Sequence, residues 1–272
     1  MRKFFSAGLI GFFLICPALL MAQFTPEELA QRAALEQYLL HAKITHHERI
    51  GEGVTKPRLL YLELDEKRMK GCWKNPTGSD LGFRENWKYE IAAYRMDKYL
   101  NVHMVPPTVE RRFRGKSGSL QLWISDLTSE LRLQREERTF PDEHRDHLEK
   151  MLCLARAFDS LIANIDRTQQ NQNYTSDWRL ILIDHSRAFR YKSFYVEQLL
   201  YGKNGMRKGN LFDRLPKIFV QKVRSLNEPL IRKIVGPYLN GEEIKALLER
   251  KTLLLEEIDE LIMERGEDSV LY

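Results

Sequence analysis

A polar segment between two apolar segments restricts the fold of this chain more than any other feature. Residues 142–165 carry apolar side chains at helical spacing, among them Leu148, Leu152 and Leu161, and this spacing predicts one long helix. Residues 178–183 form an apolar run that predicts a strand. The connecting residues, 164–173, are almost entirely polar. A polar loop held between a helix and a strand is typical of a functional site, and a purely structural helical protein would not require it.

The chain divides into a strand-rich first part and a helical second part. Patterns in the first part predict helices over residues 25–42 and 87–100, strands over 58–64, 69–74, 108–113 and 119–124, and a polar loop over 75–86. In the second part, residues 226–265 hold two or three helices, with breaks at Gly236 and Gly241. We therefore predict an α+β fold of two lobes, 23–125 with its leading helix and 126–272, with a ligand site in the cleft between them.

The first 22 residues are typical of an export signal. Arg2 and Lys3 precede an apolar run over residues 4–22, and a helix start follows it, which favours a signal peptide cleaved after Ala22. The run is also long enough for an uncleaved membrane anchor. We expect the rest of the chain to be secreted or periplasmic, and to meet a membrane only through an uncleaved N-terminal segment.

Charge and cysteine content exclude two classes of protein. The net charge is +5, and Arg2 and Lys3 contribute two of these charges, so the excess over the rest of the chain is mild. Such an excess suits an anionic ligand but does not indicate a nucleic-acid partner. One of the three cysteines lies in the N-terminal segment, so a disulfide-stapled scaffold is excluded, and we expect Cys72 and Cys153 to be free thiols.

Three residues around the polar loop have the chemistry of a phosphoryl-transfer site. Asp166 and Asn171 lie in the loop, and Asp184 ends the following strand. An aspartate can orient and deprotonate an attacking hydroxyl, while an asparagine and a second aspartate can hold a divalent cation against phosphate oxygens. Mg²⁺ and Mn²⁺ prefer oxygen ligands of this kind. Each residue alone has a structural explanation, such as a helix-end ion pair or a turn cap, so the prediction depends on their joint order and spacing.

These motifs resemble the catalytic and metal loops of the protein-kinase-like fold, in its atypical branches. The sequence Asn164-Ile165-Asp166-Arg167 is similar to that of the secreted Golgi casein-kinase family, the HipA-type bacterial kinases and the phosphatidylinositol 3-/4-kinases. Residues 90–97 and 105–109 resemble the helix of the Golgi kinases and the segment after it. Residues 71–74 (Gly-Cys-Trp-Lys) stand where such kinases carry a phosphate-holding lysine. The resemblance covers about residues 50–265.

The resemblance implies an exported kinase that uses ATP with Mg²⁺ or Mn²⁺ and phosphorylates a hydroxyl, with protein serine or threonine as the expected acceptor. It assigns Asp166 as the general base, Asn171 and Asp184 as metal ligands, and Lys74 as the phosphate-binding lysine, with Glu90 pairing Lys74 or contacting the metal. Further nucleotide contacts would come from a glycine-containing turn and from the segment that crosses between the lobes: Gly51, Gly53, Thr55, Lys56, Gln121 and Trp123.

Two alternatives remain open at this stage. The acceptor could be a sugar or a lipid, because related folds phosphorylate all three classes. The chain could also be a catalytically silent binding module, although it retains the lysine, the glutamate, both aspartates and the asparagine. A glycosylation sequon at Asn173 would put a glycan beside the predicted catalytic loop, which favours a bacterial source or a sequon that is not used.

Overall fold

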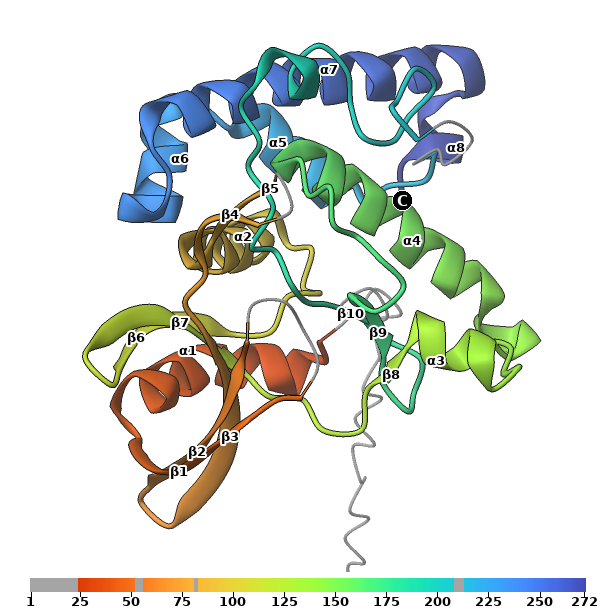
Figure 1. The fold of residues 1–272 in the computed structure, drawn as a ribbon. Helices are drawn as coiled ribbons and strands as arrows, with labels where there is room; N and C mark the ends of the chain where they lie inside the picture. Colours follow the sequence, from red (N-terminus) through yellow and green to blue (C-terminus); the bar gives the residue numbers. More distant parts are fainter. Residues whose placement is uncertain (1–23, 52–55, 81–82, 208–212) are drawn as a thin grey trace, which may run out of the picture.

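The computed structural model describes residues 24–51, 56–80, 83–207 and 213–272, so the predicted export signal lies outside the described residues. The chain forms two lobes, a sheet-containing lobe from the first part of the sequence and a helical lobe from the second (Figure 1). This arrangement confirms the predicted α+β, two-lobed fold class. Within the described residues, no helix is long and apolar enough to span a membrane.

The first lobe is built on an antiparallel five-stranded sheet. Its strand order is β1 (Lys43–Arg49), β2 (Arg58–Leu64), β3 (Lys67–Lys74), β7 (Lys116–Leu122) and β6 (Thr108–Phe113). One face carries a row of buried side chains, which includes Leu60, Leu62 and Leu120. The edge strand β1 exposes most of its side chains, and for this reason no apolar pattern marks it in the sequence.

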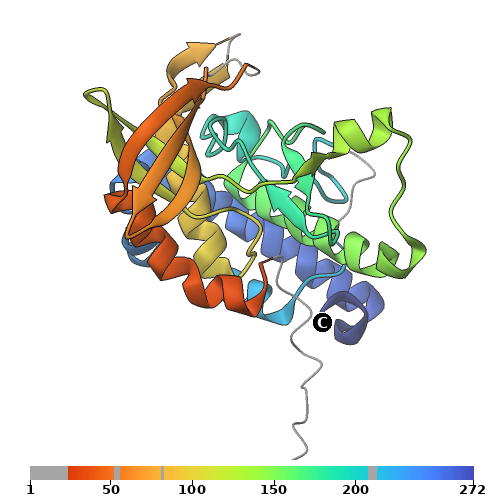
Figure 2. The same ribbon diagram turned by 90° about the horizontal axis from the view of Figure 1, so that it is seen from below.

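Helix α1 (Pro26–His41) covers the apolar face of this sheet, as the view from below shows (Figure 2). Thr25 and Glu28 form a reciprocal capping box that starts the helix. Near its end, the hydroxyl of Tyr38 donates to the carbonyl oxygens of Leu62 and Lys67, each at 2.8 Å. The helix also reaches the second lobe, because Glu28 accepts a hydrogen bond of 2.6 Å from Arg179.

Between β3 and the next helix, the prediction of a loop over residues 75–86 is wrong. Strands β4 (Thr77–Asp80) and β5 (Phe83–Asn86) form an antiparallel hairpin there. The segment is short and polar, so it lacks the apolar alternation that marks a strand packed on a core. Helix α2 (Trp87–Leu100) follows with the predicted bounds, capped by Asn86 and buried on most of its surface.

The helical lobe packs around α4 (Arg145–Ile162) and α7 (Gly241–Arg265), which lie side by side (Figure 1). The predicted helix over 142–165 starts with a 3-10 turn, and the predicted strand over 178–183 is shorter than expected. A small sheet of β8 (Thr128–Ser129), β9 (Gln172–Tyr174) and β10 (Leu180–Leu182) lies near the junction of the lobes (Figure 1). The other α-helices of this lobe are α3 (Glu130–Arg135), α5 (Lys217–Ser225), α6 (Glu228–Val235) and α8 (Glu267–Val270).

Candidate active site

A cavity of about 680 Å³ lies between the two lobes. The first lobe contributes Lys74 and Cys72 from β3, and the second lobe contributes Asn171 and Asp184. The chain crosses between the lobes along the cavity wall, and this crossing adds an apolar section. Its lining residues are Leu122, Trp123, Ile124 and Leu127. The cavity therefore combines an apolar wall with charged side chains that converge from both lobes.

Lys74 is the last residue of β3, and a glycine on the neighbouring strand lets the two strands approach there. A Cβ added to Gly118 would lie 2.4 Å from the carbonyl oxygen of Lys74 and 2.7 Å from the Trp73 ring. The Lys74 ammonium lies 2.9 Å from Glu90 Oε1 and 3.2 Å from Asp184 Oδ1. Burial by itself lowers the pKa of Lys74, but the two carboxylates outweigh it and raise the pKa, so the lysine stays charged.

Glu90 joins α2 to the segment that follows β10. Its side chain is 2% exposed, and Oε2 accepts a hydrogen bond of 3.0 Å from the backbone N–H of His185. Burial and the charge of Asp184 raise the pKa of Glu90, whereas Lys74 opposes the shift. The Glu90 carboxylate thus contacts both the lysine from β3 and the backbone beside Asp184, and fixes their relative positions.

Asp184 has the groups needed to bind a cation. Its φ of 59° lies in the left-handed region, which aspartate tolerates better than most residues. Burial raises the pKa of Asp184, but the charge and hydrogen bond of Lys74, the hydrogen bond from Ser186 and the charge of Arg167 together outweigh burial and lower the pKa, so the carboxylate is ionised. The contacts from Lys74 and Ser186 are both to Oδ1, and no described residue donates a hydrogen bond to Oδ2.

The loop that carries Asp166 is held by Arg167, whose side chain is 4% exposed. The guanidinium binds both oxygens of Asp159, at 2.8 and 3.1 Å, and donates to the carbonyl oxygens of Asn171 and Ile183. These contacts make Arg167 a residue that steadies the loop. They join the loop, α4 and the end of β10 through a single side chain.

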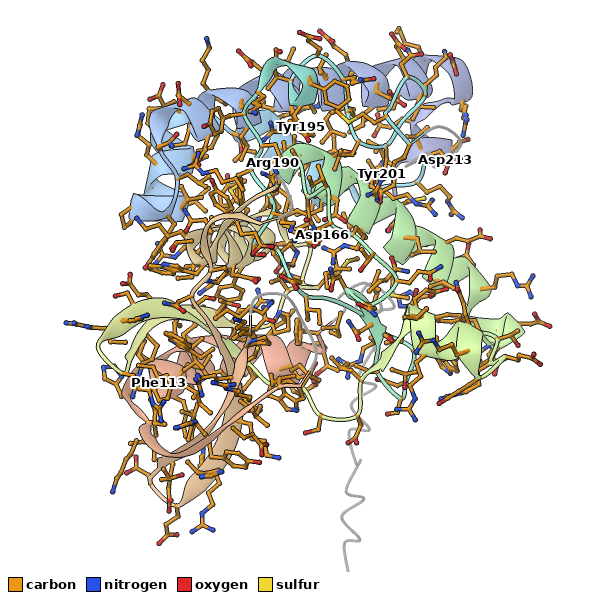
Figure 3. The ribbon with its side chains drawn as sticks, viewed as in Figure 1. Phe113, Asp166, Arg190, Tyr195, Tyr201 and Asp213 are labelled. Atoms are coloured by element: carbon orange, nitrogen blue, oxygen red, sulfur yellow. The ribbon has the colours of Figure 1, made fainter. Side chains whose placement is uncertain are left out.

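Asn171 closes the loop on itself. Its Nδ2 donates to the carbonyl oxygen of Asp166 at 2.8 Å, while no described residue donates to Oδ1. Burial raises the pKa of Asp166, and the nearby Arg187 opposes this shift. Figure 3 shows Asp166 in the region where the two lobes meet.

Three residues that support this site were not singled out for chemistry in the sequence. His185 is fully buried and accepts from Arg167 through Nε2 at 3.0 Å, so its proton resides on Nδ1, and burial holds its pKa well below the usual range. Arg187 is paired with Glu85 and with Asp166. The local signal for Arg187 was its place three positions after Asp184, the predicted metal ligand, and nothing local indicates Glu85.

The other predicted nucleotide contacts divide into three groups. Gln121 and Trp123 line the cavity, although the Gln121 amide also donates to Thr108 Oγ1 at 3.0 Å. Gly51 and Lys56 are described but do not line it, whereas their neighbours Ile50 and Pro57 do. Gly53 and Thr55 lie outside the described residues.

The sequon at Asn173 is inaccessible in the folded chain. Asn173 is 7% exposed, and its amide nitrogen donates to the carbonyl oxygen of Gln170 at 3.2 Å. A glycan attached there would replace a proton of this amide nitrogen and disturb its bond within the loop. Cys72 and Cys153 are both free thiols, as expected.

Comparisons with solved structures find proteins whose fold is similar to that of this chain. The chain is similar to a hydra Fam20 solved with sugar (TM-score 0.64, 16% identity, covering 93% of this chain and 95% of that one). It is similar to the Golgi casein kinase with Mn/ADP bound (TM-score 0.62, 14% identity, 92% and 80%). It is also similar to the proinflammatory kinase CtkA of Helicobacter pylori (TM-score 0.55, 12% identity, 85% and 97%).

No protein-family model matches the chain, and no curated protein matches its sequence. The resemblance to HipA-type and phosphatidylinositol kinases stays a prediction. The likeness to the Golgi casein kinase and CtkA spans both lobes, so the chain has an atypical protein-kinase-like fold.

Proposed function

We propose that the protein is an exported, ATP-dependent kinase that transfers a phosphoryl group to a hydroxyl, with protein serine or threonine as the acceptor. The observation that carries the proposal is the position of the Lys74 ammonium, between Glu90 and Asp184 at the charged end of the interlobe cavity. A buried lysine held by two carboxylates, beside a loop with a further aspartate and an asparagine, matches the requirements of phosphoryl transfer.

The donor atoms fit Mg²⁺ or Mn²⁺. Asp184 Oδ2 and Asn171 Oδ1 accept no hydrogen bond from the described residues, and both residues line the cavity. Two protein oxygens form an incomplete shell, which suits a cation whose other ligands are phosphate oxygens and water. The described residues contain no cluster of three or more His, Cys, Asp or Glu side chains that would hold a metal without a nucleotide.

The cavity also fits a nucleotide. Its apolar section, which includes Ile50, Leu122 and Trp123, would take the base, and Lys74 would bind the phosphate oxygens at the opposite end. When bound, ATP would supply the transferable phosphoryl group, and the cation would neutralise the charge on its oxygens. A volume of about 680 Å³ is within the range of small-molecule pockets.

Asp166 would orient the acceptor hydroxyl and receive its proton. The carboxylate is half-buried, and its raised pKa favours proton uptake more than that of a fully solvated aspartate would. Arg167 and Asn171 hold the backbone on both sides of it, so the carboxylate approaches the acceptor from a fixed loop. The proposal of export rests on residues 1–22, and the choice of a protein acceptor rests on the likeness to the Golgi casein kinase.

The direct test is label transfer from γ-labelled ATP by the full-length protein, with Mn²⁺ or Mg²⁺ and a mixed-protein substrate. We expect the wild type to label protein, and Asp166→Asn and Asp184→Asn to lose this activity. Arg145→Gln, which changes an exposed helix residue that does not line the cavity, is the control that should retain it.

A separate measurement of nucleotide binding distinguishes the possible explanations of the label-transfer result. If Asp166→Asn transfers label as well as the wild type does, its role as general base is wrong. If no label is transferred but ATP with Mn²⁺ still stabilises the protein, by about 2.7 kcal/mol at 100 times its Kd, the chain is a silent binding module or acts on another acceptor class. The absence of nucleotide binding would contradict the kinase proposal altogether.

A further inference from the structure

A second cavity, of about 490 Å³, lies on the other side of the catalytic loop. Thr168, Gln169 and Gln172 line this cavity, whereas Asn171 and Asn173 line the one between the lobes. One loop therefore forms a wall of both cavities. In Figure 3, Tyr201 of the second cavity lies beside α4, while Asp166 lies closer to the first lobe.

The second cavity has an apolar side and a polar side. Leu148 and Leu152 of α4 and the ring of Phe140 form the apolar side, and the Phe140 ring packs edge-on against Tyr174 at 4.6 Å between centroids. The polar side brings together arginine, glutamine and tyrosine side chains from four segments of the chain. These residues are Gln134, Arg156, Gln169, Gln172, Tyr201 and Arg207.

Positive charge predominates among the lining residues. Asp159 is 1% exposed and is neutralised by Arg167, which binds both of its oxygens. Glu130 is the remaining lining carboxylate, and it accepts a hydrogen bond of 3.1 Å from Gln134. Arg207 also lines the cavity and has no carboxylate partner among the described residues. The cavity therefore favours a ligand with negative charge.

Arg207 and Tyr201 provide donors that the protein itself does not saturate. Arg207 forms no ion pair with a described residue and donates only to neutral oxygens, the Tyr201 hydroxyl and the carbonyl of Ile165 at 2.8 Å. The Tyr201 oxygen accepts that bond, and its own O–H proton has no acceptor among the described residues. Burial raises the pKa of Tyr201, so the phenol remains a donor at neutral pH. A guanidinium beside a phenol O–H suits an anionic oxygen.

We propose that this cavity is a second ligand site, for a small molecule that carries a phosphate or carboxylate group. The anion binds Arg207 and Tyr201, and the rest of the molecule lies against the side chains of α4. Because Arg207 also holds the carbonyl of Ile165, next to Asp166, the ligand stabilises the loop that separates the two cavities. The inference concerns binding and does not depend on the kinase activity proposed above.

The test is isothermal titration of the full-length protein with inorganic phosphate and, separately, with citrate. Anions could also bind at Lys74, so Lys74→Met is the variant that removes the interlobe site. We expect Arg207→Gln to weaken binding by about tenfold or more, and Tyr201→Phe by a smaller factor. Lys74→Met, measured at a temperature at which circular dichroism shows it to be folded, and the surface control Arg145→Gln should retain the affinity of the wild type.

Every outcome of this titration decides the proposal. Binding that is weakened in Arg207→Gln and, by a smaller factor, in Tyr201→Phe, but kept in Lys74→Met, supports the proposal, and the stronger of the two probes then identifies the ligand group as phosphate or carboxylate. Failure of the wild type to bind either probe overturns it, as does binding that only Lys74→Met abolishes. Should Arg207→Gln fail to fold, Tyr201→Phe, which removes a single hydroxyl, decides the question by the same criterion.

Discussion

The Arg187 guanidinium bridges two carboxylates from distant parts of the chain: its Nε lies 2.7 Å from Glu85 Oε1, and Nη1 lies 3.7 Å from Asp166 Oδ2. Glu85 belongs to the β4–β5 hairpin, and Asn86 of the same hairpin donates its N–H to the carbonyl oxygen of Ser186 at 2.9 Å. The hairpin thus holds the segment after Asp184 against the proposed catalytic loop. Its contacts make Arg187 a positioning residue for Asp166.

Loss of this bridge should slow turnover more than it weakens nucleotide binding. We expect Glu85→Gln to lower kcat by about tenfold with little change in the KM for ATP, because Arg187 would then be less firmly held beside Asp166. Steady-state kinetics measure both constants. Arg187→Lys keeps the charge without the planar guanidinium and should fall between the wild type and Arg187→Gln. A change confined to KM would contradict the positioning role.

Lys74→Met should destabilise the fold even without a nucleotide. The lysine and Glu90 are 10% and 2% exposed, so removal of the ammonium leaves the buried Glu90 and the neighbouring Asp184 without their counter-ion. We expect the free energy of unfolding to fall by about 3 kcal/mol or more. Urea denaturation measures this quantity. The double variant Lys74→Met with Glu90→Gln should recover part of the loss, and equal stability of Lys74→Met and the wild type would disprove the expected charge balance.

Gly118→Ala should disturb the strand that carries Lys74. The new Cβ would lie within 3 Å of the Lys74 carbonyl oxygen and of the Trp73 ring, so β3 and β7 would have to separate. A cost of about 1–3 kcal/mol is expected from overpacking of this kind. Gly51→Ala is the matched control, since nothing lies within 4 Å of the added Cβ there. Thermal unfolding of both variants gives the comparison, and equal losses would exclude a steric cause.

Acidification should destabilise the fold through His103. Burial, together with the charges of Arg32 and Lys222, lowers the pKa of His103 to about 4, and Arg32 donates to its Nδ1 at 3.2 Å. A histidine with a depressed pKa stabilises the fold above its unfolded-state pKa of about 6.5, and this contribution is lost as the pH falls toward 4. Asp97, whose pKa burial raises to about 6, contributes in the opposite direction over much of this range.

The His103→Asn variant isolates the histidine, because Asp97 is common to both proteins. Asparagine also tolerates the φ of 58° at this position. Between pH 6.5 and pH 4, the wild type should lose up to about 3 kcal/mol of unfolding free energy relative to the variant. Urea denaturation at a series of pH values measures the difference. Parallel curves for the two proteins would mean that His103 does not titrate in this way.

Asn173 should carry no glycan in the folded protein that is secreted when the full chain is produced in a eukaryotic secretory pathway. Its side chain is buried and bonded within the loop, so a chain that receives a glycan there before folding could not reach the described fold. Mass spectrometry of the secreted protein would detect a glycan. A fully glycosylated and folded product would contradict the described position of this loop.

The local pattern of apolar residues in the sequence is enough to predict the helices and strands that pack on a core. The bounds of α2 follow from its apolar spacing, and the strand over 58–64 follows from a run of apolar side chains. The order and spacing of Asp166, Asn171 and Asp184 likewise indicate a phosphoryl-transfer site from the amino-acid sequence alone. These signals are readable because each depends on neighbours within a short distance along the chain.

The tertiary structure alone decided which distant side chains meet. The β4–β5 hairpin and the exposed edge strand β1 escaped prediction, because neither presents an apolar face to the main core. Arg187 and Glu85 are 102 residues apart, and Arg207 and Ile165 are 42 apart, yet each pair is in hydrogen-bonding contact. Such contacts form only when the lobes and loops pack against one another, so no periodic pattern in the sequence predicts them. The bridge to Asp166 and the second cavity both arise from that packing.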